Sequence, residues 1–367
     1  NLFVLRLDEV GGWYRYHQLF LDLLRSRSRE AYATASPATR ADLHARASDW
    51  FRDNELPLEG FAHAVAAGDT DRAVAILDGD GLPIHYRGSF APVERWLTTL
   101  PAAVLDERPA LRIASAWVLT TRGAPTQEIE ALLDPAERAV AAMEPDASRR
   151  DDLRGQIAAI RALIAIPRGE LEPVITNGRL ALDLLDTRNR PVRTTVAWSL
   201  GYAHQQLGEL EPARTAFEQA IDEGRTSGNL VITIGATLSL GQIHEQENRL
   251  HEATGNYHDA VRLAGDPPLP YACEAHLGLA RVAYERNELE DAAEHARIAR
   301  EMGGHLANVD TPGMAALLEA RVEIARGNAN AATAAVDTAR RVLRDRGIAH
   351  HVADVADAQA RVHLHLG

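Results

Sequence analysis

Few side chains in this sequence have the spacing that catalysis or metal binding requires. The 15 histidines form no H-E-x-x-H motif, and the nearest metal-like spacings are His350-His351 and His363-x-His365, which are more typical of a helix surface. No lysine occurs, because all 39 basic residues are arginine, so the chain has neither a P-loop lysine nor a Schiff-base lysine. We therefore predict that these residues form no enzyme and hold no metal or cofactor.

Three further groups have a chemical and a plain structural interpretation. Cys273 follows PPLPYA at a predicted helix start, where a thiol pKa can fall, although a small packing residue is the simpler interpretation. Asp151 and Asp152 stand in a charged segment that we expect to be solvated. The basic run RRVLRDRG at residues 340–347 suits the C-terminal end of a helix dipole. Because the net charge is −13, the sequence does not predict a nucleic-acid-binding surface.

The overall composition is that of an ordinary globular chain. Hydrophobic residues make up 46% and charged residues 25% of the 367 residues. The single cysteine excludes an internal disulfide and fits a reducing cytoplasm. No apolar stretch approaches the roughly 20 residues of a membrane span, so we expect no contact with a membrane. The chain opens at Asn1 with neither an initiator methionine nor a signal-peptide pattern. We therefore expect it to be an excised fragment of a longer protein.

A repeat dominates the second half of the sequence. Segments such as IPRGELEPV and QLGELEPAR align around a turn residue. The five turn residues are spaced by 39, 40, 39 and 40 residues, and they are Gly169, Gly208, Asn248, Asn287 and Gly327. Leu or Ala stands two positions after each turn, and Val or Ala stands five positions after it. This regularity predicts a repeat architecture.

Each repeat predicts a pair of antiparallel helices. Gly and Asn tolerate the left-handed backbone conformation that ends a helix. Leu200-Gly201 and Leu240-Gly241 repeat before the turn, and Phe217 and Tyr257 repeat after it. One hairpin cannot bury its own apolar face, so neighbouring hairpins must stack. The pattern resembles the tetratricopeptide repeat, although its period of 39–40 residues exceeds the usual length of about 34. We predict an all-α, right-handed superhelix of tetratricopeptide-like helix hairpins.

The first half of the sequence is less regular. Turn signals stand at Asn54 and Gly68, and residues 108–125 predict a helix that ends at Gly123. The one strand that we expect is LFVLRL at residues 2–7, followed by DEVGG as a turn.

The concave surface of the predicted superhelix is the best candidate for a binding site. The first helix of each hairpin should line it, and counting back from each turn gives the inward positions. The side chains predicted there are Trp198, Tyr202, Gln205, Gln206, Gln242, Glu245, Gln246, Arg281, Tyr284, Glu285 and Arg321. Aromatic rings with amide, carboxylate and guanidinium groups can hold a sugar or another small polar effector. The same set can hold a peptide of a partner protein, and a polar face without a ligand is a third interpretation.

The densest aromatic stretch, GGWYRYHQLFLDLLRSR, lies near the start of the chain. Its aromatic and histidine side chains are Trp13, Tyr14, Tyr16, His17 and Phe20. With the preceding NLFVLRLDEV, it is similar to the end of the nucleotide-binding region of MalT-type transcriptional activators, which are large regulators of the LuxR class. Further matches follow in the family's order, namely LHARASDWF, FAHAVAAGD, GSFAPVERWLTTLP and RPALRIASAWVL. The resemblance covers about residues 1–125, and it favours a packing seam over a ligand site at these aromatics.

The resemblance implies an architecture larger than this chain. It assigns residues 1–35 to the end of a winged-helix segment and a linking helix, 36–150 to irregular helical hairpins, and 151–367 to the tetratricopeptide-like sensor. It places ATP on an upstream ATPase and DNA on a downstream helix-turn-helix domain, so these residues would bind neither directly. It implies that a small inducer or a partner binds the superhelix and promotes self-association. The alternative is a protein-docking scaffold that recognises a peptide or a partner regulator through the concave surface.

Overall fold

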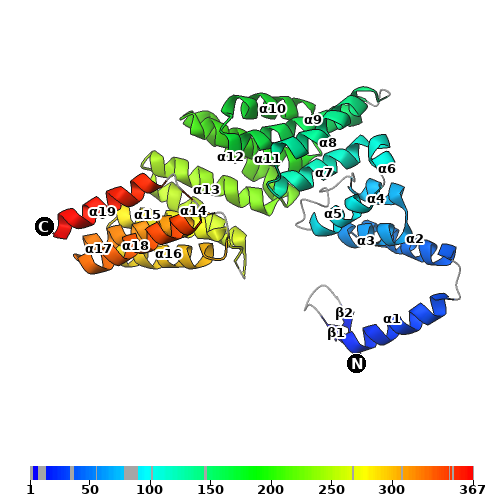
Figure 1. Cartoon of the computed structure of the whole chain (residues 1–367), viewed down its shortest axis with the longest axis horizontal. Coiled ribbons are helices and arrows are strands. Elements are labelled where there is room, and N and C mark those ends of the chain that lie inside the picture. Colours follow the sequence, from blue (N-terminus) through cyan, green and yellow to red (C-terminus); the bar gives the residue numbers. More distant parts are fainter. Residues whose placement is uncertain are drawn as a thin grey trace. The chain divides into compact units, whose positions relative to one another are not determined.

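The computed structural model of the chain is built almost wholly of helices (Figure 1). The residues that it describes are 3–6, 14–33, 37–54, 56–77, 90–100, 102–143, 147–266, 268–306, 309–346, 348 and 351–366. These residues fall into two compact units, one with the described residues up to Leu100 and one with those from Ala102 onward.

The first unit begins with a short hairpin and a helix. Its elements are β1 (Val4–Arg6), β2 (Tyr14–Tyr16) and α1 (Gln18–Ala33). The two strands pair antiparallel in the register Val4–Tyr16, Leu5–Arg15 and Arg6–Tyr14. The expected strand at residues 2–7 is confirmed for its centre, whereas its ends and the turn after it lie outside the described residues.

Four helices complete the described part of the first unit. They are α2 (Pro37–Asp53), α3 (Pro57–Ala67), α4 (Thr70–Leu77) and α5 (Phe90–Thr99). Both predicted turns are confirmed, because α2 ends directly before Asn54 and α3 ends at Gly68, whose φ is 72°. The rings of Phe61 on α3 and Trp96 on α5 meet edge to face at 5.3 Å in the core.

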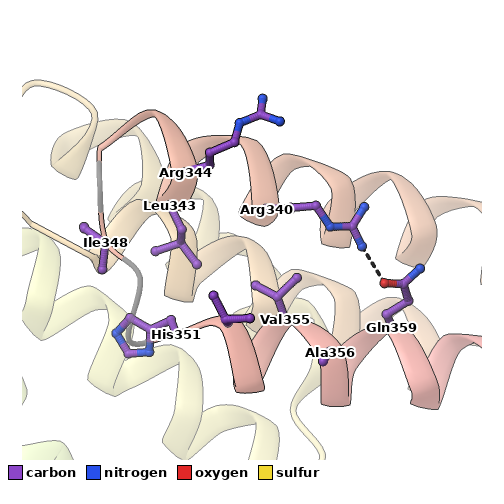
Figure 2. A pocket seen from close by; sticks show the side chains of 9 residues that line it. Arg340, Leu343, Arg344, Ile348, His351, Val355, Ala356 and Gln359 are labelled. Atoms are coloured by element: carbon purple, nitrogen blue, oxygen red, sulfur yellow. Dashed lines mark hydrogen bonds between the residues drawn. The ribbon is translucent and has the colours of Figure 1, made fainter.

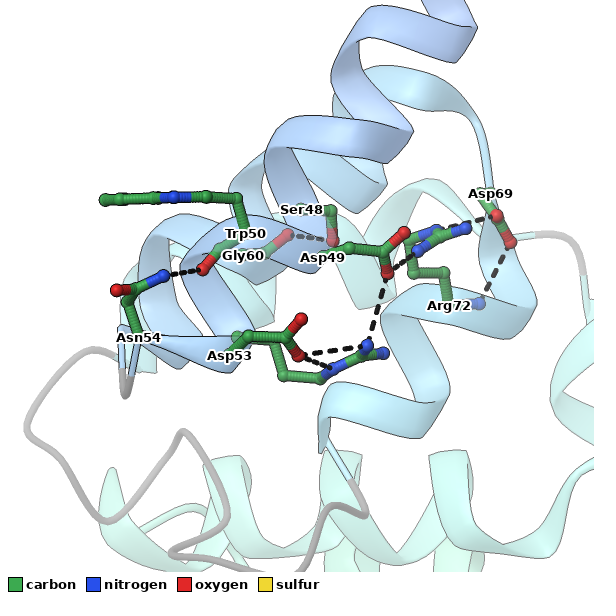
Figure 3. A network of polar contacts seen from close by, with 9 residues as sticks. Ser48, Asp49, Trp50, Asp53, Asn54, Gly60, Asp69 and Arg72 are labelled. Carbon is green, nitrogen blue, oxygen red and sulfur yellow. Dashed lines mark hydrogen bonds and ion pairs between the residues drawn. The ribbon is translucent and has the colours of Figure 1, made fainter.

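Polar contacts hold α2 against α3 and α4 (Figure 3). Ser48 on α2 donates a hydrogen bond of 2.7 Å to the carbonyl oxygen of Gly60 on α3. Arg72 on α4 forms ion pairs with Asp49 on α2 and with Asp69. The carboxylate of Asp69 also accepts the backbone N–H of Arg72 at 2.9 Å, and this bond is the main cause of its lowered pKa. Asp69 therefore caps the first turn of α4.

The second unit is a row of antiparallel helix hairpins. Its elements are α6 (Ala102–Glu107), α7 (Pro109–Thr121), α8 (Thr126–Ala141), α9 (Ala147–Ala165), the short 3-10 helix Ile166–Arg168, α10 (Leu171–Leu184), α11 (Arg190–Gln206), α12 (Leu210–Ser227), α13 (Leu230–Gln246), α14 (Leu250–Ala264), α15 (Ala272–Glu285), α16 (Leu289–Gly303), α17 (Thr311–Ala325), α18 (Ala329–Asp345) and α19 (Val352–Leu366). From α9 to α18, each first helix packs against the second helix that follows it, and the hairpins lie side by side (Figure 1). The predicted all-α fold of tetratricopeptide-like hairpins is confirmed. The helix predicted within residues 108–125 is α7, and Gly123 after it has a φ of 67°.

All five predicted turn residues have the left-handed conformation that the repeat requires. The φ angles are 69° at Gly169, 75° at Gly208, 59° at Asn248, 61° at Asn287 and 78° at Gly327. The second helix of each hairpin begins two residues after this turn, at the repeated Leu or Ala. A single backbone requirement therefore fixes where one helix ends and the next begins.

Gly208→Ala tests the cost of this conformation alone, because a β-carbon at Gly208 meets no atom within 4 Å. We expect the substitution to lower the free energy of unfolding by about 1 kcal/mol, since an L-residue is strained in the left-handed region. Gly255→Ala is the matched control, because Gly255 lies inside α14 and also has open space around it. We expect Gly255→Ala to raise the free energy of unfolding by roughly 0.5–1 kcal/mol. Urea denaturation measures both values, and effects of the same sign would contradict this role of the turn.

Glycines let the first helices approach aromatic rings of the second helices. A β-carbon at Gly201 would lie 2.6 Å from the ring of Phe217, and one at Gly241 would lie 2.8 Å from the ring of Tyr257. Phe217 and Tyr257 stand forty residues apart at the same repeat position, and both are buried. On its other side, the Tyr257 ring meets Gly278 of the next hairpin, where a β-carbon would lie 2.4 Å away. Each ring is therefore held in a slot that only glycine leaves open.

Candidate functional site

The first helices of successive hairpins form a continuous layer in the second unit. α11 packs against α13, α13 against α15, α15 against α17, and α17 against α19. Of the eleven side chains predicted for a binding surface, four lie on α11, three on α13, three on α15 and one on α17. Seven of them are partly buried and four are exposed. We call these eleven side chains together the first-helix surface.

An aromatic pair stands at the α11 end of the first-helix surface. The rings of Trp198 and Tyr202 are stacked, with their centroids 6.0 Å apart and their planes at 26°. Trp198 also packs on the core between α11 and α13, and a β-carbon at Gly235 would lie 3.4 Å from its Nε1 atom. Both rings are only partly buried, so part of each side chain is accessible.

Glu245 on α13 and Arg281 on α15 form a bidentate ion pair. Nε of Arg281 donates to Oε1 of Glu245 at 2.7 Å, and Nη2 donates to Oε2 at 2.9 Å. The hydroxyl of Tyr257 on α14 donates to the same Oε2 atom at 2.7 Å and accepts a longer bond of 3.3 Å from Arg281. These contacts join three helices of two hairpins.

Burial and hydrogen bonding set the charge states in this cluster. Burial raises the pKa of the Tyr257 hydroxyl far above its ordinary value, so the group stays a neutral donor. Burial alone would lower the pKa of Arg281, but the bonds to Glu245 outweigh it and the pKa is raised. Arg281 is therefore a permanent cation, and the carboxylate of Glu245 neutralises its charge.

The remaining charged groups of the first-helix surface are also paired. The guanidinium of Arg321 on α17 lies over the ring of Tyr284, 4.7 Å from its centroid. A nitrogen of the same guanidinium lies 3.9 Å from a carboxylate oxygen of Glu285 on α15. Both cations of this surface are therefore engaged between helices: Arg281 pairs with α13, and Arg321 of α17 contacts α15.

The four glutamines differ from the charged groups. Their side-chain amides form no hydrogen bond with any described residue. The four are Gln205, Gln206, Gln242 and Gln246. Each amide offers two N–H donors and one acceptor oxygen. The arrangement thus combines a stacked aromatic pair with uncommitted amides, and this combination suits a neutral, polar ligand better than a strongly charged one.

Tyr257 on α14 is a buried partner of the first-helix surface that sequence reasoning missed. It was expected only as a repeated packing position equivalent to Phe217. The signal was the change from Phe to Tyr at a buried repeat position, because a buried hydroxyl needs a partner. Here the partners are Glu245 and Arg281 on the first helices.

Cys273 and His351, which were considered for reactive or metal-binding chemistry, form packing and hydrogen-bonding contacts in the structure. Cys273 is fully buried, and burial raises its thiol pKa to about 11, which confirms the interpretation as a packing residue. His351 bonds to Asp310 at 2.8 Å and to Asp354 at 2.6 Å, and His363 is exposed. His350 and the side chain of His365 lie outside the described residues. Among the described residues no group of three or more His, Cys, Asp or Glu is arranged to hold a metal ion.

Two charged segments serve the contacts between helices. Asp151 and Asp152, which were expected in a solvated segment, are partly exposed, and Asp152 also accepts hydrogen bonds from the backbone N–H of Asp186 at 3.0 Å and from the amide of Asn189 at 3.1 Å. These bonds hold α9 against the loop that leads into α11. In the basic run at residues 340–347, Arg346 donates to the carbonyl oxygens of Gly303, the last residue of α16, and of Gly304 and Leu306 after it. This cation therefore sits at a helix C-terminus, as its charge requires.

The aromatic stretch near the start of the chain forms packing contacts where it is described. The ring of Phe20 lies 4.7 Å from that of Phe3 and 5.4 Å from that of Tyr16. His17 is exposed, and Trp13 and the side chain of Tyr14 lie outside the described residues. The packing seam with a further domain remains a prediction.

A pocket lies apart from the first-helix surface. It has a volume of about 500 Å³ and lies between α18 and α19 (Figure 2). None of the eleven predicted residues lines it.

No helix in the described part of the chain is long and apolar enough to cross a membrane.

Stacked hairpins, left-handed turns at a period of 39–40 residues and a continuous layer of first helices together define a tetratricopeptide-like helical array. Residues 155–367 match the family described as the MalT-like TPR region, and residues 1–36 match the MalT winged helix domain. The chain belongs to this MalT-like family of tetratricopeptide regions.

Curated relatives of the chain have the name HTH-type transcriptional regulator MalT. Those of Yersinia pestis and Yersinia enterocolitica are each 28% identical over 304 residues. Each alignment covers 81% of this chain but only 32% of the relative, so the chain matches about a third of their length.

Solved structures share the fold at low identity. A signal-transduction ATPase with numerous domains and a tetratricopeptide repeat sensor, from Pyrococcus horikoshii, superposes with a TM-score of 0.65 and 14% identity. That superposition covers 98% of this chain and 53% of the other. PilF of Pseudomonas aeruginosa matches with a TM-score of 0.50 and 18% identity, over 70% of this chain and 98% of the other.

Proposed function

We propose that this chain is the effector-sensing and self-association region of a MalT-like transcriptional regulator, and that the first-helix surface binds a small inducer. The observation that carries the proposal is the stacked Trp198–Tyr202 pair on the same surface as four glutamine amides that have no hydrogen-bond partner among the described residues. Rings of this kind stack on the apolar face of a sugar or a similar metabolite, and amides bond its hydroxyl groups.

The ion pairs of the same surface supply a fixed frame for that ligand. Glu245, Arg281 and Tyr257 satisfy one another, so they hold α13, α14 and α15 in one arrangement. A ligand that binds this arrangement more tightly than another shifts the population toward it. A coupling of roughly 1–3 kcal/mol is the usual size of such an effect.

The family supports the wider context of the proposal. The relatives are named as helix-turn-helix regulators, and the chain matches only about a third of their length. This sequence contains no lysine and therefore no P-loop lysine. In this account ATP and DNA bind to other domains of the full protein, in the cytoplasm, and the residues described here sense the effector and catalyse nothing.

A protein-docking scaffold is the second candidate. One observation favours it: the first-helix surface continues over α11, α13, α15 and α17, a longer stretch than a small metabolite needs. An extended peptide along these helices would use the same glutamine amides to bond its backbone.

A thermal-shift screen against sugars, nucleotides and small metabolites separates the two candidates. A ligand at about 100 times its dissociation constant adds roughly 2.7 kcal/mol, which we expect to raise the melting temperature by roughly 3–5 °C. Tyr202→Ala should abolish the shift, because it removes half of the stacked pair. Tyr271→Ala should keep it, because Tyr271 is 48% exposed at the start of α15 and outside the predicted set.

Equal shifts in both variants would place the ligand elsewhere and contradict the proposed site. No shift across the library would favour the docking scaffold, which pull-down with the purified protein as bait would then test.

A further inference from the structure

The pocket between the last two helices is an apolar groove, here called the terminal groove. Leu343 and Ile348 lie on one side of it, and Val355 and Ala356 lie on the other (Figure 2). Val352 on α19 also lines it. At its far end Arg340 donates a hydrogen bond of 2.6 Å to the side-chain oxygen of Gln359, which bridges the two helices. Arg344 and His351 complete the lining, which is mostly apolar and therefore suits apolar side chains.

α19 has two apolar faces, and the structure covers only one of them. Val355, Ala358 and Val362 are at most 8% exposed and belong to the core that α19 shares with α17 and α18. On the other side Val352 is 68% exposed, and Ala356 and Ala360 are exposed as well. A helix that is apolar on two sides is typical of the interior of a helix stack.

The preceding hairpin shows what covers the second face. Forty residues before Val352, Ala356 and Ala360 stand Pro312, Ala316 and Ala320 of α17, all of which are buried. α18 helps to cover Ala316 and Ala320 of α17, because its side chains Ala332, Val336, Ala339 and Leu343 share one core cluster with them. The cross-helix bond repeats too: Arg300 donates to Glu319 at 2.9 Å, forty residues before Arg340 and Gln359.

We propose that the terminal groove receives one further helix of the same polypeptide, which packs on α19 as α18 packs on α17. The curated relatives are about three times as long as the part that they share with this chain, so they have many residues outside the matched part. This inference concerns the continuation of the array, and it stands whether or not the first-helix surface binds an effector.

The repeat fixes the register of the helix that would fill the groove. α18 begins two residues after Gly327, and its buried side chains follow at five, nine, twelve and sixteen residues, namely Ala332, Val336, Ala339 and Leu343. Gly367 stands forty residues after Gly327 in the sequence. The new helix begins two residues after Gly367 and carries small or apolar side chains at the same four positions.

Thiol labelling of the full-length regulator tests the proposal. Ala356→Cys places a thiol on the open face of α19, and Arg361→Cys, five residues further along the same helix, is the matched control. Arg361 stands forty residues after Arg321 of the first-helix surface and is 60% exposed, so a second helix would not cover it. Alkylation followed by peptide mass spectrometry gives the rate at each site, and the buried Cys273 reports in the same sample that the fold is intact.

We expect the thiol at position 356 to react at least about tenfold more slowly than that at 361 at every protein concentration, and both to react equally in denaturant. Equal rates in the native protein would overturn the proposal. Protection at 356 that is lost on dilution would also overturn it, because a second copy would then fill the groove. If Ala356→Cys exposes Cys273, Ala360→Cys on the same face replaces it.

Discussion

Phe217→Ala is expected to lower the free energy of unfolding by about 3–5 kcal/mol, the usual cost of removing a buried phenyl ring. The side chain of Phe217 is 0% exposed and lies in the core between α11, α12 and α13. Its ring fills the slot above Gly201, so the substitution leaves a cavity that the rigid glycine contact cannot close. Urea denaturation followed by circular dichroism measures the loss.

Gly201→Ala makes this prediction specific to one contact. In the natural chain we expect it to cost about 1–3 kcal/mol, because its β-carbon would lie 2.6 Å from the ring of Phe217. In the Phe217→Ala background the clash is gone, and the same change should be neutral or stabilising by up to about 1 kcal/mol. Strict additivity of the two substitutions would contradict the ring-in-slot contact.

The second large expected effect is a loss of folding stability at acid pH, caused by the pair His276 and His295. Nδ1 of His276 on α15 lies 3.1 Å from Nδ1 of His295 on α16, so one ring donates a hydrogen bond and the other accepts it. Burial, together with His295 and His258, lowers the pKa of His276 to about 4. Burial and His258 also lower the pKa of His295, which Asp291 and Glu294 partly oppose.

The sign of the pH dependence follows from the lowered pKa. The unfolded chain takes up a proton near pH 6.5, whereas the folded chain resists it down to about pH 4. Stability is therefore lost as the pH falls through this window, by an amount on the order of 2–3 kcal/mol. His276→Asn keeps a hydrogen-bonding group but cannot be protonated, so its free energy of unfolding should fall less between pH 7 and pH 4.

His351→Asn is the control of opposite sign. Burial lowers the pKa of His351, but the bonds to Asp354 and Asp310 outweigh it, and the pKa is raised. Its contribution to stability is present at low pH and is lost as the pH rises through the raised pKa. His351→Asn should therefore make the acid loss steeper, and profiles that change in the same direction for both variants would contradict these assignments.

The turns and helix starts were predictable because they depend on local backbone geometry. Gly169, Gly208, Asn248, Asn287 and Gly327 are residue types that accept a positive φ, and nothing distant is needed to recognise them. The regular spacing then implied stacked hairpins, since an isolated hairpin leaves its apolar face in water.

The pairing of side chains between helices was not predictable in the same way. Glu245 and Arg281 were both expected on one surface as groups for a ligand, but the structure joins them to each other across 36 residues. Their contact depends on how α13 and α15 pack, which the repeat period alone does not state. The same reason explains Asp152, whose partners lie on a loop 34 and 37 residues away.

The terminal groove was hidden in the sequence for a different reason. Val352, Ala356 and Ala360 repeat the apolar pattern of α17, so their spacing looks like that of any covered helix. Only the structure shows that Ala316 is covered whereas Ala356 is exposed.

The claim that the hairpins sense an effector for a regulator is tested most directly by the oligomeric state of the full-length protein. Sedimentation velocity with ATP would compare the protein alone with the protein saturated by the compound that raises its melting temperature most. The account predicts a larger sedimentation coefficient with the compound, and no change for Tyr202→Ala at the same concentration. An unchanged coefficient of the natural protein at saturation would contradict it.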